Sequence, residues 1–277
     1  MIKNMRRKRI TITIREDVLR KIDTIIDGKN IRNRSNAIET VLAEKFKNNI
    51  IQKAVILGGR RLTKIGNKNV PELLIPVHGR PLLEHQIEKF KSIGVNELII
   101  STGKYKQQIK DIFGNGDSFG LHIRYIDSEG SAGILNKIKD DVKGGFLVIN
   151  GDIYIEDIDF EDMYNFHRLN KGQATILVAT VENSTPLGSI FMKGNQIIDF
   201  KEKMKIQSYG AHLVNAGVYI IEQSVCKMKL PKHPMFEHDV FTELAKQKKL
   251  IGYQSSTPWI HLHSEKHLRF YEKRKLI

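Results

Sequence analysis

One short stretch of the sequence has residue types that could bind phosphate. The apolar run KAVIL (residues 53–57) leads directly into Gly58 and Gly59, and Arg60 and Arg61 follow. Glycines allow a backbone to approach phosphate closely, and arginine guanidinium groups bind phosphate oxygens through charge-assisted hydrogen bonds. A tight turn at the end of a strand would use the same glycines, so this stretch alone leaves both interpretations open.

A pair of histidines is the second candidate for chemistry. His261 and His263 are two residues apart, so on a strand they would share one face. Together with Asp152 they could bind zinc or manganese, but a pair of surface or hydrogen-bonded histidines is the favoured interpretation. The single cysteine, Cys226, can form no internal disulfide, which favours a reducing cytoplasm.

Alternating strand and helix patterns must position these residues. Strands are predicted at residues 53–57, 97–101, 122–126, 146–150, 174–181 and 214–221, and helices at 81–92, 104–112, 131–139 and 158–170. Strands that alternate with helices indicate an α/β domain with a mainly parallel sheet. Gly58 and Gly59 would then lie at the carboxyl end of the first strand, where open α/β sheets bind ligands.

The beginning of the sequence is much more basic than the rest. About half of the formal net charge of +14 lies within residues 1–52, and the pI of the whole sequence is about 9.7. Charge of this size favours an anionic partner such as nucleic acid, a phosphorylated ligand or an acidic membrane. No long apolar run follows the basic start, so we expect neither a signal peptide nor a membrane partner.

Residues 9–15 alternate between polar and apolar side chains, which predicts a strand. Two amphipathic helices are expected after it, the second with Ser35 as its N-cap. A lone strand leaves its backbone groups unpaired, so we expect the same strand of a second chain to complete an antiparallel ribbon. The inner face of this ribbon would be Ile10, Ile12 and Ile14, and the outer face Arg9, Thr11, Thr13 and Arg15.

This first segment resembles a known class of DNA-binding domain. RITITIREDVLRKID followed by NRSNAIETVL is similar to the ribbon-helix-helix domains. The resemblance implies that the ribbon enters the major groove of double-stranded DNA, where Arg and Thr side chains contact base edges. Arg34, Ser35 and Asn36, at the start of the second helix, would position a phosphate. The alternative is a dimerisation unit with a solvated basic tail.

The remainder of the chain resembles the sugar-1-phosphate nucleotidyltransferases. The segments ILGG, PELLIPVHGRPLLEHQI, GSAGIL, FLVINGD, IIDFKEK, NAGVY and PWIHL follow one another in the order that this family shows. The resemblance implies a Rossmann-like α/β fold with a mainly parallel mixed sheet. It also implies that a nucleoside triphosphate and a sugar phosphate condense to a nucleotide sugar and pyrophosphate. Residues 1–50 and 53–277 are therefore expected to be two domains.

The resemblance also implies roles for individual residues. Nucleotide binding is expected at Gly58, Gly59, Gly130, Ser131, Ala132 and Gly133, with Arg60 added for its charge. Sugar binding is expected at Glu202 and Asn215, and catalysis, if the chain is active, at Arg61 and Lys203. Asp152 matches a metal-binding aspartate, which implies Mg²⁺ as a cofactor.

Three departures from the family pattern concern the chemistry itself. The opening loop GGRRL is two residues shorter than the family's Gly-Gly-x-Gly-Thr-Arg-Leu, and Glu72 follows Pro71 where the family has a lysine. His261 stands where a second magnesium-binding aspartate is expected, and magnesium prefers oxygen ligands. Because phosphoryl-type transfer relies on cations that offset developing charge, we expect these changes to weaken catalysis more than binding.

These observations lead to three hypotheses for function. The leading one is a cytoplasmic DNA-binding transcriptional regulator, a homodimer or higher homo-oligomer, whose second domain binds a nucleotide, sugar phosphate or nucleotide sugar. The alternative is an active sugar-1-phosphate nucleotidyltransferase that carries an autoregulatory DNA-binding domain. The third is a structural protein whose first domain only dimerises.

Overall fold

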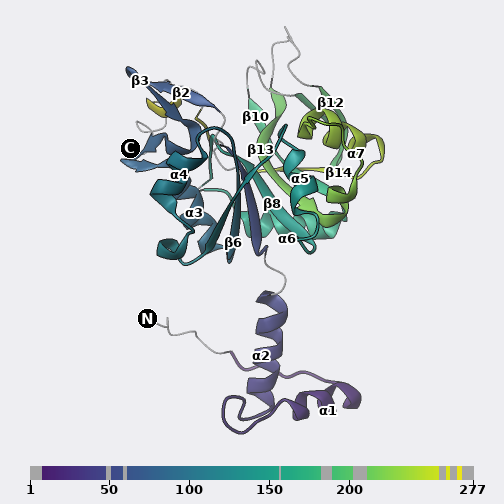
Figure 1. The fold of residues 1–277 in the computed structure, drawn as a ribbon. Coiled ribbons are helices and arrows are strands. Elements are labelled where there is room, and N and C mark those ends of the chain that lie inside the picture. Colours follow the sequence, from purple (N-terminus) through teal and green to yellow (C-terminus); the bar gives the residue numbers. More distant parts are fainter. Residues whose placement is uncertain are drawn as a thin grey trace. The chain divides into compact units, whose positions relative to one another are not determined.

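A computed structural model describes residues 8–47, 51–58, 61–155, 157–181, 189–201, 211–255, 260–262 and 267–269. The chain divides into two compact units, Met1–Asn49 and Ile50–Ile277, and both are drawn in Figure 1. Within the described residues, no helix combines the length and the apolar character that crossing a membrane requires.

In the first unit, described from residue 8 to residue 47, an extended segment is followed by two helices, α1 (Glu16–Thr24) and α2 (Arg34–Lys47). Residues 8–15 are not assigned as a strand, in contrast to the prediction. The physical reason is that a strand needs a hydrogen-bonded neighbour, and the described residues of this chain supply none for it. The predicted cap is also different, because the Asn33 side chain accepts the backbone N–H of Asn36 at 2.9 Å and Ser35 lies within the first helical turn.

The second unit is built on a twisted mixed sheet, which within the described residues has nine strands. In spatial order these are β10 (Ala174–Val181), β14 (Leu250–Gln254), β12 (Gln196–Lys201), β11 (Ser189–Lys193), β13 (His212–Glu222), β8 (Gly145–Asn150), β1 (Lys53–Leu57), β6 (Glu97–Thr102) and β7 (His122–Asp127). The strands from β8 to β7 run parallel, while β13 pairs with β8 antiparallel. The predicted α/β fold is therefore confirmed for this unit.

Helices cover both faces of the sheet (Figure 1). One face packs against α3 (Leu82–Ser92), α4 (Lys106–Phe113) and α6 (Phe160–Asn170), and the other against α5 (Gly133–Ile138) and α7 (Thr242–Lys246). The second face also holds a π-helical turn at Phe236–Phe241, which directly precedes α7. Shorter helical turns lie at Glu72–Leu74, Asp117–Phe119 and Gln223–Lys227.

Among the residues that the structure describes, three small two-stranded ladders lie outside the main sheet. They pair β2 (Leu62–Ile65) with β3 (Lys68–Pro71), β4 (Pro76–Val77) with β5 (Arg80–Pro81), and β9 (Ile153–Tyr154) with β15 (Ile260–His261). The last ladder matters for the site, because it joins segments that are far apart in the sequence.

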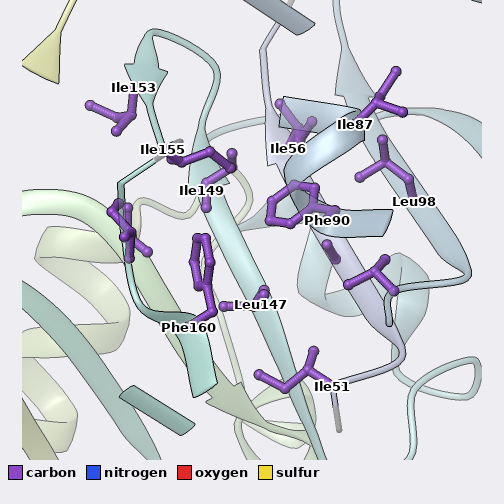
Figure 2. Packing of buried hydrophobic residues seen from close by; sticks show 14 of the residues in the cluster. Ile51, Ile56, Ile87, Phe90, Leu98, Leu147, Ile149, Ile153, Ile155 and Phe160 are labelled. Atoms are coloured by element: carbon purple, nitrogen blue, oxygen red, sulfur yellow. The ribbon is translucent and has the colours of Figure 1, made fainter. Parts of the chain in front are cut away.

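The core follows from the alternation of side chains along the strands. Ile56 of β1 belongs to the cluster that Leu98, Leu147 and Phe90 also join, whereas its neighbour Val55 points into the cluster on the opposite face. Figure 2 shows the first of these clusters, in which the rings of Phe90 and Phe160 have their centroids 5.9 Å apart. Burial of both faces explains why the central strands are continuous apolar runs.

Candidate active site

The site lies where the carboxyl ends of β1 and β8 meet. The backbone N–H of Gly151 donates to the carbonyl of Leu57 at 2.8 Å, and that of Gly58 donates to Ser101 at 3.0 Å. A Cβ on Gly58 would lie 2.7 Å from the buried side chain of Leu73, and one on Gly151 would lie 3.0 Å from the Cα of Gly58. Glycine at position 151 therefore allows the two strand ends to approach this closely, and a side chain at position 58 would displace Leu73.

A cavity of about 270 Å³ opens at these strand ends. The residues that line it come from separate segments of the second unit: Leu57, Gly58, Arg61, Glu72, Ser101, Gly130, Ser131, Asn150, Asp152, Met235 and Glu237. Ser101 and Asn150 are at or next to the carboxyl ends of their strands, the position at which parallel sheets bind ligands.

Asp152 is a deeply buried charged group of the cavity. Its Oδ2 accepts a hydrogen bond from His261 Nε2 at 2.9 Å and lies 3.6 Å from a guanidinium nitrogen of Arg61. Burial alone would raise the pKa of this carboxyl, but the hydrogen bond from His261 and the attraction of His261 and Arg61 outweigh it. The pKa of Asp152 is thus below its ordinary value, and the group is a carboxylate.

The donor set around Asp152 does not suit magnesium. Its neighbours are an imidazole and a guanidinium, whereas magnesium takes oxygen ligands in octahedral geometry. Across the part of the chain that the structure describes, no three His, Cys, Asp or Glu side chains are grouped so that they could hold a metal ion. His263 lies outside the described residues, so the predicted histidine pair is not tested.

The loop at Gly130–Gly133 forms a second wall of the site. Gly130 has φ +68°, and a Cβ there would lie 2.1 Å from the carbonyl oxygen of Pro234. The backbone N–H of Ala132 donates to the same carbonyl at 3.0 Å, and the Ser131 hydroxyl accepts from Phe236. Gly130 and Ser131 line the cavity, while Ala132 is buried behind it and Gly133 begins α5.

Asn215 belongs to a hydrogen-bonded network at the edge of the cavity. Its Nδ2 donates to the hydroxyl of Tyr219 at 2.9 Å and to Glu237 Oε1 at 3.4 Å, and its Oδ1 accepts from the backbone of Gly217. Burial raises the pKa of Tyr219 well above its usual value, so this phenol stays protonated. The network fixes the orientation of Asn215 and joins it to Glu237, which lines the cavity.

Some residues that line the cavity were not predicted from the sequence. Ser101 and Asn150 could have been found, because each ends a predicted strand. Met235 and Glu237 gave no such signal, since Glu237 lies on the π-helical turn and Met235 precedes it. Such turns often occur at functional sites. Of the predicted site residues, Gly59, Arg60, Glu202 and Lys203 lie outside the described residues.

The residues predicted to bind DNA lie in the first unit. Arg9, Thr11, Thr13 and Arg15 are exposed, as is Ser35, and the side chain of Arg15 pairs with Asp17. Arg34 donates two hydrogen bonds to the carboxylate of Asp23, from Nε at 2.7 Å and from Nη2 at 2.9 Å. Asn36 Oδ1 accepts the backbone N–H of Arg32. Arg34 and Asn36 thus stabilise the unit itself.

Known proteins resemble the second unit in sequence. Residues 53–260 match the family described as Nucleotidyl transferase. The mannose-1-phosphate guanylyltransferase catalytic subunit beta of Dictyostelium discoideum is 30% identical over 219 residues, which cover 75% of this chain and 60% of that protein. The bifunctional protein GlmU of Methanococcus maripaludis is 32% identical over 171 residues, 60% of this chain and 38% of that protein. The chain thus spans at most about 60% of the length of these relatives.

Solved structures confirm the fold. HddC from Yersinia pseudotuberculosis, in complex with GMP-PN, has a TM-score of 0.67 at 19% identity, covering 81% of this chain and 100% of that one. UDP-glucose pyrophosphorylase in complex with UDP-glucose has a TM-score of 0.66 at 18% identity, with the same coverage. At these identities, the likeness establishes the α/β architecture of the second unit and nothing further.

The leading hypothesis from the sequence, a DNA-binding regulator with impaired catalysis, is wrong. The relatives at about 30% identity are named as nucleotidyltransferases of sugar phosphates, which favours the alternative of an active enzyme. The hypothesis inferred impaired catalysis from a missing lysine, a missing magnesium-binding aspartate and a shortened loop, while Arg61, the arginine that it took as retained, lies at the cavity and beside Asp152. Since its family match covers most of the sequence, the chain belongs to the nucleotidyl transferase family.

Proposed function

We propose that the second unit transfers a nucleotidyl group from a nucleoside triphosphate to a sugar 1-phosphate. A phosphate oxygen of the sugar phosphate would attack the α-phosphorus, the bond to the β-phosphate would break, and pyrophosphate would leave. The observation that carries this proposal is the convergence of Gly58, Arg61, Gly130 and Asp152 on one cavity. The names of the relatives favour GTP and mannose 1-phosphate as the first substrate pair to test.

The nucleotide would lie against Gly58 and the wall formed by Gly130 and Ser131. Gly58 has no side chain between the end of β1 and the cavity, so a phosphate could approach its backbone closely. Arg61 is largely exposed at the cavity and would offset charge that develops on the phosphate oxygens. Glu72 lines the same cavity and is 5% exposed, so a triphosphate needs additional positive charge to enter.

The sugar would lie at the side of the cavity that Asn215 and Glu237 define. A carboxylate accepts hydroxyl hydrogen bonds, and an amide both donates and accepts them, so the pair matches a polyhydroxylated ligand. The hydrogen bond between these side chains, at 3.4 Å, holds Glu237 near the residue that the family resemblance assigns to the sugar. We therefore include Glu237 in the proposed sugar site.

Removal of Arg61 tests the proposed reaction. We expect the purified chain with GTP, mannose 1-phosphate and MgCl₂ to release pyrophosphate and form a nucleotide sugar, and Arg61→Ala to lower kcat/KM by roughly a hundredfold or more. The matched control is Lys64→Ala, an exposed cation on β2 that does not line the cavity. If a panel of triphosphates and sugar phosphates gives no nucleotide sugar by mass spectrometry with folded protein, the proposal fails.

Two glycine substitutions test the position of the nucleotide. Gly130 and Gly144 have similar φ values, +68° and +74°, but only Gly130 has a neighbour, Pro234, where a Cβ would be added. We expect Gly144→Ala to cost about 1–2 kcal/mol of stability and to leave GTP affinity unchanged. Gly130→Ala should weaken GTP binding at least about tenfold in calorimetry, because the loop must move. Equal affinities in both variants would contradict this assignment.

Glu237→Gln tests the sugar site. Replacing a charged acceptor by a neutral one should raise KM for the sugar phosphate about tenfold while leaving KM for the nucleotide unchanged. Glu243→Gln on α7 is the control, since Glu243 does not line the cavity. Steady-state kinetics with each substrate varied in turn measures both constants. A change in the nucleotide KM alone would show that Glu237 serves the nucleotide.

For the first unit we propose a ribbon-helix-helix fold that is completed by a second copy. Ile10 and Ile12 are 69% and 51% exposed, and no residue of α1 is buried, so that Val18 on this helix and Ile25 directly after it are also exposed. Apolar surface of this extent in so small a unit favours association, because too little of it is covered within one chain. Pairing of two copies of residues 9–15 would also satisfy their backbone groups.

The oligomeric state tests this pairing. Light scattering on the full chain should report a dimer or a higher oligomer, and Ile12→Asp on the inner face should shift it to a smaller species. Thr13→Asp, one residue along and on the outer face, is the control and should leave the mass unchanged. A monomer at all concentrations of the unmodified chain would contradict the proposal.

A further inference from the structure

The carboxylate of Asp152 already has two partners from the protein. Both converge on the same atom, Oδ2, which accepts from His261 Nε2 at 2.9 Å and lies 3.6 Å from Arg61. The side chain of Asp152 is 6% exposed, and that of His261 is 19% exposed. One oxygen of the carboxylate is thus engaged by a hydrogen bond from His261 and by the positive charge of Arg61.

Backbone pairing holds His261 in this position. β15 pairs with β9, so that His261 is opposite Ile153, and the backbone N–H of Leu262 donates to the carbonyl of Asp152 at 2.8 Å. Leu262 is itself buried in a small apolar cluster with Tyr154 and Leu268. Pairing of the two backbones therefore places the side chain of His261 within reach of Asp152.

We infer that Asp152 does not hold a divalent cation and acts instead as the counter-ion that holds His261 and positions Arg61 at the cavity. Any divalent cation of the reaction is then bound by the phosphates of the nucleotide and enters and leaves with them. This inference rests on the proposed function for the presence of phosphates in the cavity. It differs from what the family resemblance implies, because a metal-binding carboxylate would need further oxygen ligands from the protein.

Manganese binding without nucleotide tests the inference. The full chain is titrated with MnCl₂, and free Mn²⁺ is measured by electron paramagnetic resonance. We expect no site of sub-millimolar affinity in the unmodified protein. His261→Asp places a second carboxylate beside Asp152. This variant should bind one Mn²⁺ ion at least about tenfold more tightly than the unmodified protein does. His122→Asp, at an exposed position on β7, is the matched control and should create none.

Two results would overturn the inference. One is a nucleotide-free Mn²⁺ site in the unmodified protein that Asp152→Asn removes, and the other is folded His261→Asp protein that gains no site. Circular dichroism establishes whether the His261→Asp protein folds. If this variant does not fold, the Mn²⁺ affinities of the unmodified protein and of Asp152→Asn test the inference by themselves. Because these titrations require no turnover, failure of the proposed reaction would leave their outcome unchanged.

Discussion

The close approach of Gly58 and Gly151 is the contact on which the site depends. These glycines end adjacent parallel strands, and Leu73 fills the space that side chains on either glycine would need. Because the two backbones lie almost in contact, the loop that carries Arg61 and the turn that carries Asp152 open into one cavity. The apolar strands provide a rigid base for this arrangement, since both faces of β1 and β8 are buried.

The charges of the cavity suggest how the chain differs from what the family pattern implies. Glu72, Asp152 and Glu237 are acidic, and Arg61 is the cationic side chain among the described lining residues. An anionic substrate would therefore meet Arg61 as the cation of the described lining, and a cation bound to the substrate would add to that charge. The orientation of Arg61 then matters for binding. Asp152 provides that orientation in our account. On this view, the residues that replace the family's lysine and second aspartate change the source of the positive charge that faces the phosphates. Matching the sequence to the family pattern residue by residue does not reveal such a change.

Much of the second unit could be predicted because its strands are long apolar runs. The strands beginning at Lys53, Gly145 and Ala174 were expected within a residue or two of their observed bounds. The ladder of β9 with β15 was not, since two-residue strands have no periodicity and their pairing is decided by tertiary contacts. Glu237 was missed for a related reason, because a π-helical turn changes the direction of side chains without a signature in sequence.

The predictions for the first unit were less accurate. The strand predicted at residues 9–15 needs a partner strand, which the described residues do not supply. The second helix is capped by Asn33 and not, as predicted, by Ser35 two residues later.

Hydrogen–deuterium exchange with and without GTP tests the central claim, that three separate segments form one nucleotide site because the ends of β1 and β8 are in contact. We predict that backbone amides of residues 57–58, 130–133 and 151–153 exchange more slowly together in saturating GTP, while those of α4 are unchanged. Slower exchange in only one of these segments, or only at positions remote from the cavity, would contradict the account.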